Sequence, residues 1–246
     1  MRSDAAIVIP ARFQSSRFPG KPLVPLLGKP MVLWVCERCA DALDADSTCV
    51  ATDDVRIAHV VEEAGFNAVM TSPSALTGTD RVAEAAELLD KDVVVNVQGD
   101  EPTLDPSDIV SVLDTKFSNV NEVVNGFCRV SVDEDPTNVN IPKVAMSESG
   151  RMLYMSRAAV PGSKELVADT LDYFKQVCIY GFTREELRAF HRFGRKSALE
   201  AREDIEILRF LELEVPVRMV ETSGKSYAVD VPEDVPRVES ILREQS

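Results

Sequence analysis

The sequence predicts an α/β protein in which helices cover both faces of a largely parallel sheet. In the first half, short apolar runs alternate with amphipathic segments, whereas in the second half strand-like runs follow one another with few helices between them. Alternating strands and helices are typical of a doubly wound, Rossmann-like sheet, which binds ligands at the carboxyl ends of its strands. The later runs predict mixed or antiparallel additions, so we expect three layers and a small antiparallel extension.

Hydrophobic periodicity places the elements of the first half. Apolar runs predict buried strands at residues 5–9, 48–52, 67–70 and 93–97. Amphipathic segments predict helices at residues 30–43, 54–65, 79–90 and 106–115. The last helix has the clearest start, because Asp105 can cap it and Pro106 suits its first position.

In the second half the same criteria predict mostly strands. These are expected at residues 123–130, 142–146, 152–155, 177–182 and 215–220. Helices are expected at residues 183–192 and 200–213 and from Pro232 onward, with a mobile loop at residues 161–170. Because no repeat, low-complexity tract or linker interrupts the sequence, we expect a single domain over residues 1–246.

Composition argues against several classes of protein. Lys and Arg total 27 against 41 Asp and Glu, a net charge of −14 that disfavours nucleic acid and anionic membranes as partners. No apolar run approaches the roughly 20 residues that cross a bilayer. The short apolar stretch near the N-terminus is also too interrupted for a signal peptide. We therefore expect a cytoplasmic protein.

The cysteines point to the same compartment. There are five, an odd number in a chain too large to depend on disulfides, which indicates reducing surroundings. Cys36 and Cys39 form a CxxC pair, the spacing of some redox and metal sites. Met31 and Val35 share their helical spacing, so we expect a place in the core instead.

The segment from Pro10 to Lys21 follows the first strand and concentrates positive charge in an acidic chain. It carries Arg12, Arg17 and Lys21 together with two serines and a glycine. Such a loop can wrap a triphosphate, because arginine forks pair with phosphate oxygens and lysine adds a point charge. It lacks the glycine spacing of a Walker A loop. The alternative is a solvated basic loop.

Two acidic segments are candidates for a metal site. Asp100 follows a strand and Gly99, which permits close backbone approach, so its carboxylate suits Mg²⁺. The alternative is a turn in which Asp100 is a local cap. Asp230 can provide a second carboxylate or can cap the last helix, and its spacing does not distinguish the two.

Three further segments are ambiguous. The sequence Thr77-Gly78-Thr79-Asp80-Arg81 begins a helix, where its amides and hydroxyls can meet a ligand or merely cap. The segment at 52–54 is equally open. Three carboxylates repeat at three-residue spacing, which places them on one helix face, either as a solvated acidic stripe or with one of them accepting hydrogen bonds from a ligand. They are Glu200, Glu203 and Glu206.

Together these segments resemble the CMP-Kdo synthetases, the 3-deoxy-manno-octulosonate (Kdo) cytidylyltransferases. The resemblance covers almost the whole chain in the family's order. It rests on IPARFQSSRFPGKPL at 9–23, VATDD at 50–54, TGTDR at 77–81, NVQGDEP at 96–102, NIPK at 140–143, YMSRAAVP at 154–161, IYGF at 179–182, LEAREDIEILR at 199–209 and VDVPEDV at 229–235.

The resemblance implies a fold like that of the nucleotide-diphospho-sugar transferases and a Mg²⁺-dependent reaction. In that reaction CMP passes from CTP to the anomeric hydroxyl of an acidic 2-keto-3-deoxy sugar, Kdo or a close relative, and pyrophosphate leaves. The product would serve synthesis of a surface polysaccharide of the lipopolysaccharide type. The family also implies a homodimer.

The family's functional residues carry over to this sequence by motif. The catalytic set would be Arg12, Lys21, Asp100 and Asp230, with the last two holding the metal. The nucleotide side would comprise Pro10, Ala11, Arg12, Ser16, Arg17, Lys21, Thr52, Gly78, Thr79, Arg81 and Gln98. The acceptor side would comprise Gln98, Arg157, Gln176, Tyr180, Glu200, Glu203 and Glu206.

The sequence departs from the family on the acceptor side. Gln176 stands where the family has a histidine, and residues 160–164 lack the Trp or Arg often found there. Transfer to another ulosonic acid, an 8-amino-Kdo or a sialic-type nine-carbon acid, is therefore an alternative. A non-catalytic nucleotide-binding regulator is a second alternative, although Lys21, Asp100 and Asp230 are all retained.

Overall fold

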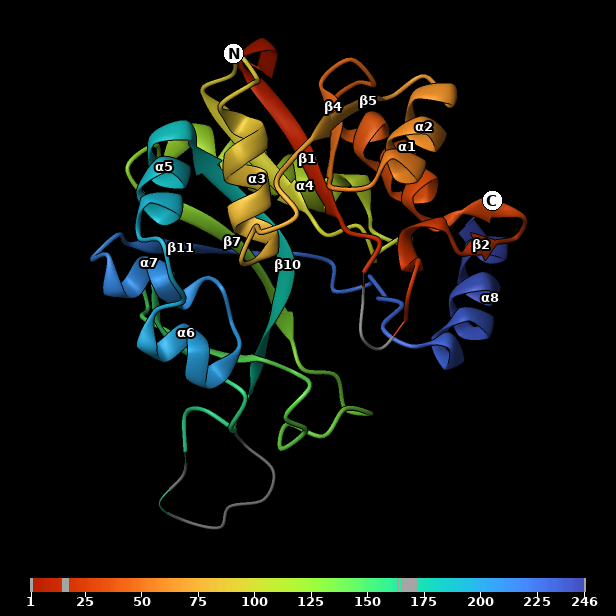
Figure 1. The fold of residues 1–246 in the computed structure, drawn as a ribbon. Helices are drawn as coiled ribbons and strands as arrows, with labels where there is room; N and C mark the ends of the chain where they lie inside the picture. The colour runs from red at the N-terminus through yellow and green to blue at the C-terminus, as the bar shows by residue number, and fades with distance from the viewer. Residues whose placement is uncertain (1, 15–17, 163, 165–171, 246) are drawn as a thin grey trace.

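The computed structural model describes residues 2–14, 18–162, 164 and 172–245. A nine-stranded mixed sheet forms its centre (Figure 1). The main path of the sheet runs β11 (Val217–Glu221), β7 (Val123–Arg129), β10 (Phe174–Thr183), β6 (Val93–Val97), β1 (Ala5–Ala11), β4 (Thr48–Thr52) and β5 (Asn67–Met70). Strands β6, β1, β4 and β5 are parallel, whereas β10 is antiparallel to both β6 and β7. The predicted parallel first half and mixed second half are thus confirmed.

Helices cover both faces of the sheet, which explains the unbroken apolar runs of the parallel strands. On β1, Ile7 and Val8 point to opposite faces and enter two different core clusters. The cluster around Ile7 includes side chains of α1 (Met31–Ala42), α2 (Val55–Glu63) and α4 (Pro106–Ser118). The cluster around Val8 includes side chains of α3 (Gly78–Ala86), α5 (Arg184–Arg192) and α7 (Leu208–Glu212), and Figure 1 shows α3 and α5 side by side.

Two smaller units adjoin this core. The predicted antiparallel extension consists of β8 (Lys143–Met146) and β9 (Met152–Ser156), and β8 joins the main sheet through β10. A hairpin of β2 (Pro25–Leu26) and β3 (Lys29–Pro30) packs with the terminal helix α8 (Val235–Gln245), as Figure 1 shows. The remaining elements are α6 (Ala198–Glu203) and the 3-10 helices η1 (Arg2–Asp4), η2 (Lys21–Leu23) and η3 (Pro232–Asp234).

The structure corrects several expected boundaries. The single helix predicted at 200–213 is wrong: α6 ends at Glu203, Asp204 takes a left-handed conformation at φ 52°, and α7 begins only at Leu208. Helix α3 ends at Ala86, and the terminal helix is preceded by η3. Within the expected mobile loop, residues 163 and 165–170 lie outside the described part.

The structure also bears on the CxxC pair and on membrane segments. Cys36 and Cys39 are both fully buried in the core, as expected, and burial raises the pKa of the Cys39 thiol well above its usual range. Such thiols are poor nucleophiles and poor metal ligands. None of the described helices has the length and apolarity that crossing a bilayer requires.

Candidate active site

A cavity of about 390 Å³ opens where β1 and β6 end. The backbone at the end of β1 and the backbone after β6 approach closely because residue 99 is a glycine. A Cβ atom at this position would lie only 3.0 Å from the carbonyl oxygen of Pro10. This is the approach that the sequence predicts for that glycine. The cavity is lined by Pro10, Ala11, Arg12, Lys21, Pro22, Ala75, Leu76, Thr77, Gly78, Arg81, Gln98, Gly99, Asp100, Lys196, Asp204, Glu206 and Asp230.

Lys21 brings the two candidate metal carboxylates together. Its Nζ lies 2.6 Å from Oδ2 of Asp100 and 3.7 Å from Oδ1 of Asp230. The backbone adds to this arrangement, because the amide of Val229 donates to the carbonyl of Asp100 at 2.9 Å. The proximity of two aspartates 130 positions apart, which sequence spacing left open, is therefore a property of the fold.

Asp230 does not cap the terminal helical segment. Asp234 is the capping residue, because its Oδ2 accepts from the amides of Asp230 at 2.8 Å and Val231 at 3.0 Å. The carboxylate of Asp230 instead faces Lys21 in the cavity.

The surroundings of these two carboxylates are strongly acidic. Glu101, the next residue after Asp100, is 9% exposed. Burial, together with the nearby negative charges of Asp100 and Asp230, raises the pKa of Glu101 to about 7. Glu101 is therefore only partly ionised near neutral pH, and a cation placed near Asp100 and Asp230 would favour its charged form.

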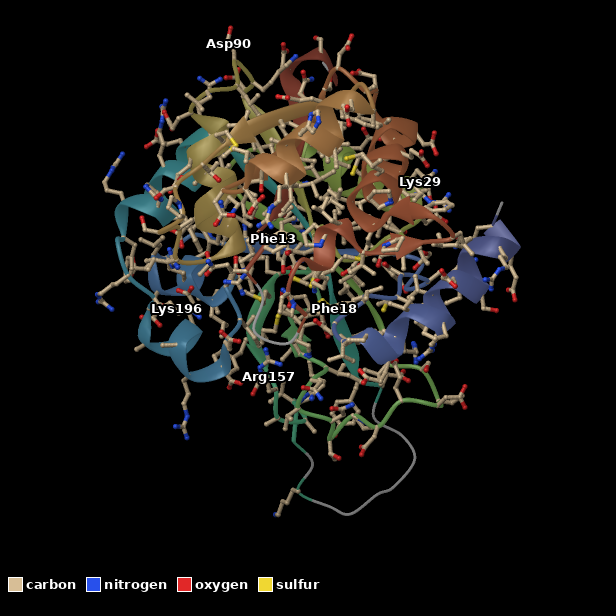
Figure 2. All side chains as sticks on the ribbon, turned by 45° about the vertical axis from the view of Figure 1, so that its right-hand side comes forward. Phe13, Phe18, Lys29, Asp90, Arg157 and Lys196 are labelled. Carbon is tan, nitrogen blue, oxygen red and sulfur yellow. The ribbon has the colours of Figure 1, made fainter. Side chains whose placement is uncertain are left out.

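The phosphate-loop candidate is anchored at both ends. The amide of Gly20 donates to the carbonyl of Phe13 at 2.9 Å, and Gly20 has a φ of 72°. The ring of Phe13 lies under the guanidinium of Arg56 at 3.4 Å, and Asp54 holds that guanidinium through two hydrogen bonds. Phe13 and Phe18, near the two ends of the loop, are labelled in Figure 2. Ser16 and Arg17 lie outside the described residues.

The first turn of α3 contributes to the cavity in a different way from that expected. The amides of Gly78 and Thr79 donate to the two carboxylate oxygens of Glu206, at 3.1 and 2.8 Å. These amides are therefore taken by the chain itself. Arg81 lines the cavity and is held by Asp53 at 3.1 Å.

Several residues expected at the site do not line the cavity. Thr52 and Thr79 are buried and are not among its lining residues. Tyr180 is also buried, stacks on Phe182, and has a pKa well above its usual range because of burial. Gln176 donates to Oδ1 of Asn125 at 3.1 Å in the sheet.

The three carboxylates of the 199–209 motif do not share one helix face, so that prediction is wrong. Glu200 is fully buried, and both of its oxygens accept from Arg209 at 2.7 Å. Glu203 accepts from the Ser156 hydroxyl at 2.8 Å and from the Arg157 amide at 2.9 Å. Only Glu206 reaches the cavity, because the turn after Asp204 changes the direction of the chain.

Arg157 hydrogen-bonds backbone carbonyls near the end of α6. Its guanidinium donates to the carbonyls of Glu203 and Asp204 at the end of α6, and to that of Val139. Figure 2 shows Arg157 and Lys196 on the part of the molecule that carries α6. Arg157 is therefore a neighbour of the cavity wall and not one of its lining residues.

Sequence reasoning missed two charged lining residues. Lys196 and Asp204 form an ion pair at 2.9 Å on the wall that also carries Glu206. Lys196 lies just outside the 199–209 motif, and Asp204 reaches the wall only because the predicted helix breaks there. Knowledge of that break would have been needed to find them.

Comparison with known proteins identifies the family of this chain. Residues 6–219 match the sequence profile of the cytidylyltransferase family. The 3-deoxy-manno-octulosonate cytidylyltransferase of Syntrophotalea carbinolica is 40% identical, over 96% of this chain and 97% of its own. The protein of the same name from Myxococcus xanthus is 39% identical, over 96% and 95%.

The chain belongs to the 3-deoxy-manno-octulosonate cytidylyltransferase family. The resemblance inferred from the motifs is thereby confirmed. A solved structure of a CMP:2-keto-3-deoxy-manno-octonic acid synthetase complexed with CTP superposes with a TM-score of 0.91 at 33% identity. That match covers 99% of this chain and 100% of the other.

A more distant neighbour defines the wider fold. A putative glucose-1-phosphate thymidylyltransferase from Bacillus anthracis superposes with a TM-score of 0.70 at 16% identity, covering 98% of this chain and 96% of its own. At that identity the likeness concerns the fold alone. It agrees with the nucleotidyltransferase-type, Rossmann-like architecture expected from the sequence.

We predict that Gly20→Ala weakens CTP binding about tenfold, because a small displacement of positioning groups costs that much or more. A Cβ at Gly20 would lie 3.1 Å from Cζ of Phe13, on a backbone with φ 72°. Calorimetric titration with CTP measures the effect.

Gly28→Ala is the matched control, because Gly28 has a similar φ of 83° and no described atom within 4 Å of the added Cβ. Both variants carry the backbone strain, but only Gly20→Ala disturbs the loop. Equal CTP affinities for the two variants would contradict the assigned role of the Phe13–Gly20 contact.

Proposed function

We propose that this protein transfers CMP from CTP to the anomeric hydroxyl of Kdo or a close relative and releases pyrophosphate, for lipopolysaccharide-type synthesis. The observation that carries the proposal is the joint approach of Lys21, Asp100 and Asp230 in one cavity. Cations and paired carboxylates at the carboxyl ends of parallel strands suit a polyphosphate with its counter-ion. Relatives at 40% identity, named for this reaction, support the same reading.

We propose Mg²⁺ as the metal, held by Asp100 and Asp230. Mg²⁺ is commonly bound by one or two carboxylates together with substrate phosphates, so a two-carboxylate set fits it. The described residues gather no group of three or more metal-ligating side chains, which agrees with a metal that needs its substrate for binding. The ammonium of Lys21 marks where these carboxylates attract positive charge. When bound, the metal would neutralise phosphate charge.

We propose that the chain's own cations bind the nucleotide. Arg12 and Lys21 line the cavity on the side of the phosphate loop, and we propose that they hold the triphosphate and stabilise the departing pyrophosphate. Arg81, fixed by Asp53, would lie beside the nucleoside. Neither histidine lines the cavity, which agrees with transfer by positioning and charge neutralisation instead of a histidine base.

The acceptor carries a carboxylate, so its pocket needs positive or hydrogen-bonding groups. Gln98 and Glu206 line the cavity at the first turn of α3, where a Cβ atom on Gly78 would lie 3.7 and 3.6 Å from their side chains. We propose that they bind sugar hydroxyls and that Arg157 holds the wall behind them through its bonds to the end of α6.

Two further proposals concern surroundings and assembly. Buried thiols without disulfide partners, such as Cys36 and Cys49, suit a reducing compartment, and we propose the cytoplasm.

Strand β9 pairs only with β8 among the described strands and carries Leu153, which is 62% exposed. We therefore propose β9 as the contact of a homodimer.

The dimer proposal predicts that Leu153→Glu converts the protein to a monomer while CTP binding persists. Light scattering after size exclusion measures the mass. Wild-type protein that is already monomeric, or a variant that stays dimeric, would contradict the proposed contact.

The function itself is tested by pyrophosphate release, with CTP or UTP against Kdo, 8-amino-Kdo and sialic-type acids. We expect release with CTP, Mg²⁺ and Kdo or its amino analogue, and none with UTP or after chelation by EDTA. Release only with nine-carbon acids would identify the other acceptor class. No release with any acid would favour a non-catalytic nucleotide-binding regulator.

We predict that Asp100→Asn lowers turnover by at least about 100-fold, a loss typical of removing one charge-stabilising group. The substitution keeps the volume, so the melting temperature should change little. Asp90→Asn is the control, because Asp90 is exposed at the far end of the molecule from Arg157 (Figure 2). Near-normal turnover of Asp100→Asn would refute the metal assignment.

A further inference from the structure

Side chains from Glu206 and Arg209, at the start of α7, bind three successive residues in the first turn of α3. Glu206 accepts from the amides of Gly78 and Thr79, and Arg209 binds the carboxylate of Asp80. Three successive residues of α3 are therefore held by one turn of chain, since the Arg209 amide itself donates to the carbonyl of Glu206 at 3.1 Å. We call Glu206, Arg209 and Asp80 the α3 clasp.

Arg209 is the centre of the clasp and is fully buried. All five of its N–H donors are used: two go to Glu200, two to Asp80 and one to the carbonyl of Phe190, at 2.7–3.2 Å. The guanidinium also stacks on the Phe190 ring at 3.6 Å. A planar fork suits this set of acceptors, whereas an ammonium cannot reach both carboxylates in two-point fashion.

The clasp leads directly to the cavity. Asp80 accepts from the hydroxyl of Thr77 at 2.8 Å, and that hydroxyl accepts from the amide of Asp80 at 3.1 Å. Thr77, Gly78 and Arg81, which flank or adjoin Asp80, all line the cavity. Arg209 itself does not line the cavity, and its side chain is connected to the lining residues of α3 through Asp80 and the turn that Asp80 fixes.

The ion pairs of Arg209 with Asp80 and Glu200 are deeply buried, so their geometry tolerates little change. Asp80 and Glu200 are 2% and 0% exposed, and two carboxylates at such depth are stable as anions only with a well-placed cation. A change at Arg209 is therefore relieved by movement of the elements that carry its partners. One of these partners, Asp80, lies in the first turn of α3 between the lining residues Gly78 and Arg81, and the other, Glu200, lies in α6.

We propose that Arg209 is a positioning residue that acts through Asp80: it fixes the first turn of α3 and thereby sets the affinity of the cavity for its nucleotide. The inference rests on the proposed function for the identity of that nucleotide. The position of the turn itself does not depend on it.

The test uses Arg209→Lys and Asp80→Asn in the full-length protein. Both variants keep the volume of the site nearly constant, and the first also keeps the charge, so both should fold with a lowered melting temperature. We expect the KM for CTP to rise about tenfold while kcat at saturating CTP is retained, because a misplaced wall weakens binding. Hydrogen exchange at the amides of Gly78 and Thr79 should also become faster, without any nucleotide present.

Glu186→Gln is the matched control for loss of a buried ion pair. Glu186 binds Lys116, which is 0% exposed, at 2.7 Å, and neither residue lines the cavity. We expect this control to lower the melting temperature and leave both the CTP KM and the exchange of the two amides at their wild-type values.

Two results would overturn the proposal. One is a fall in kcat with unchanged KM in the clasp variants, which is the effect of a reduced folded fraction alone. The other is an equal change in the control. Failure of the proposed function is seen separately, as absent turnover in the wild-type protein, and in that case amide exchange alone decides whether Arg209 fixes the turn.

Discussion

The ammonium of Lys21, 2.6 Å from Asp100 and 3.7 Å from Asp230, joins three segments that enter the cavity from different parts of the chain. Lys21 follows β1, Asp100 follows β6, and Asp230 precedes the terminal helix. Two carboxylates that face one ammonium are close enough to repel one another, and the charge of Lys21 offsets that repulsion. The pairing of β1 with β6 and the close approach at Gly99 give that cation its place.

The gathering of the proposed nucleotide-side residues in one cavity was predictable, because most of them follow buried strands. Pro10, Lys21, Gln98 and Asp100 follow apolar runs, and parallel strands bring their carboxyl ends to one edge of the sheet. Asp230 has no such strand beside it. Its place depends on the backbone bond from Val229 to Asp100, a long-range contact that periodicity cannot reveal.

The arrangement of the residues proposed for the acceptor side was less predictable, for reasons that particular residues show. The spacing of Glu200, Glu203 and Glu206 predicts a common face only while the helix continues. Asp204, in a left-handed conformation, ends that helix. As a result one carboxylate pairs with Arg209 in the core, one binds Ser156, and one reaches the cavity.

The bonds of Glu206 to the start of α3 have a consequence for the choice of ligand group. A helix N-terminus ordinarily attracts anions, but here a carboxylate tethered to the same chain already occupies it. A tethered group competes at an effective concentration on the order of millimolar, so a free phosphate would meet an intramolecular rival there. We therefore expect these two amides to be closed to a phosphate, and the basic loop after β1 to be the place where a polyanion would bind.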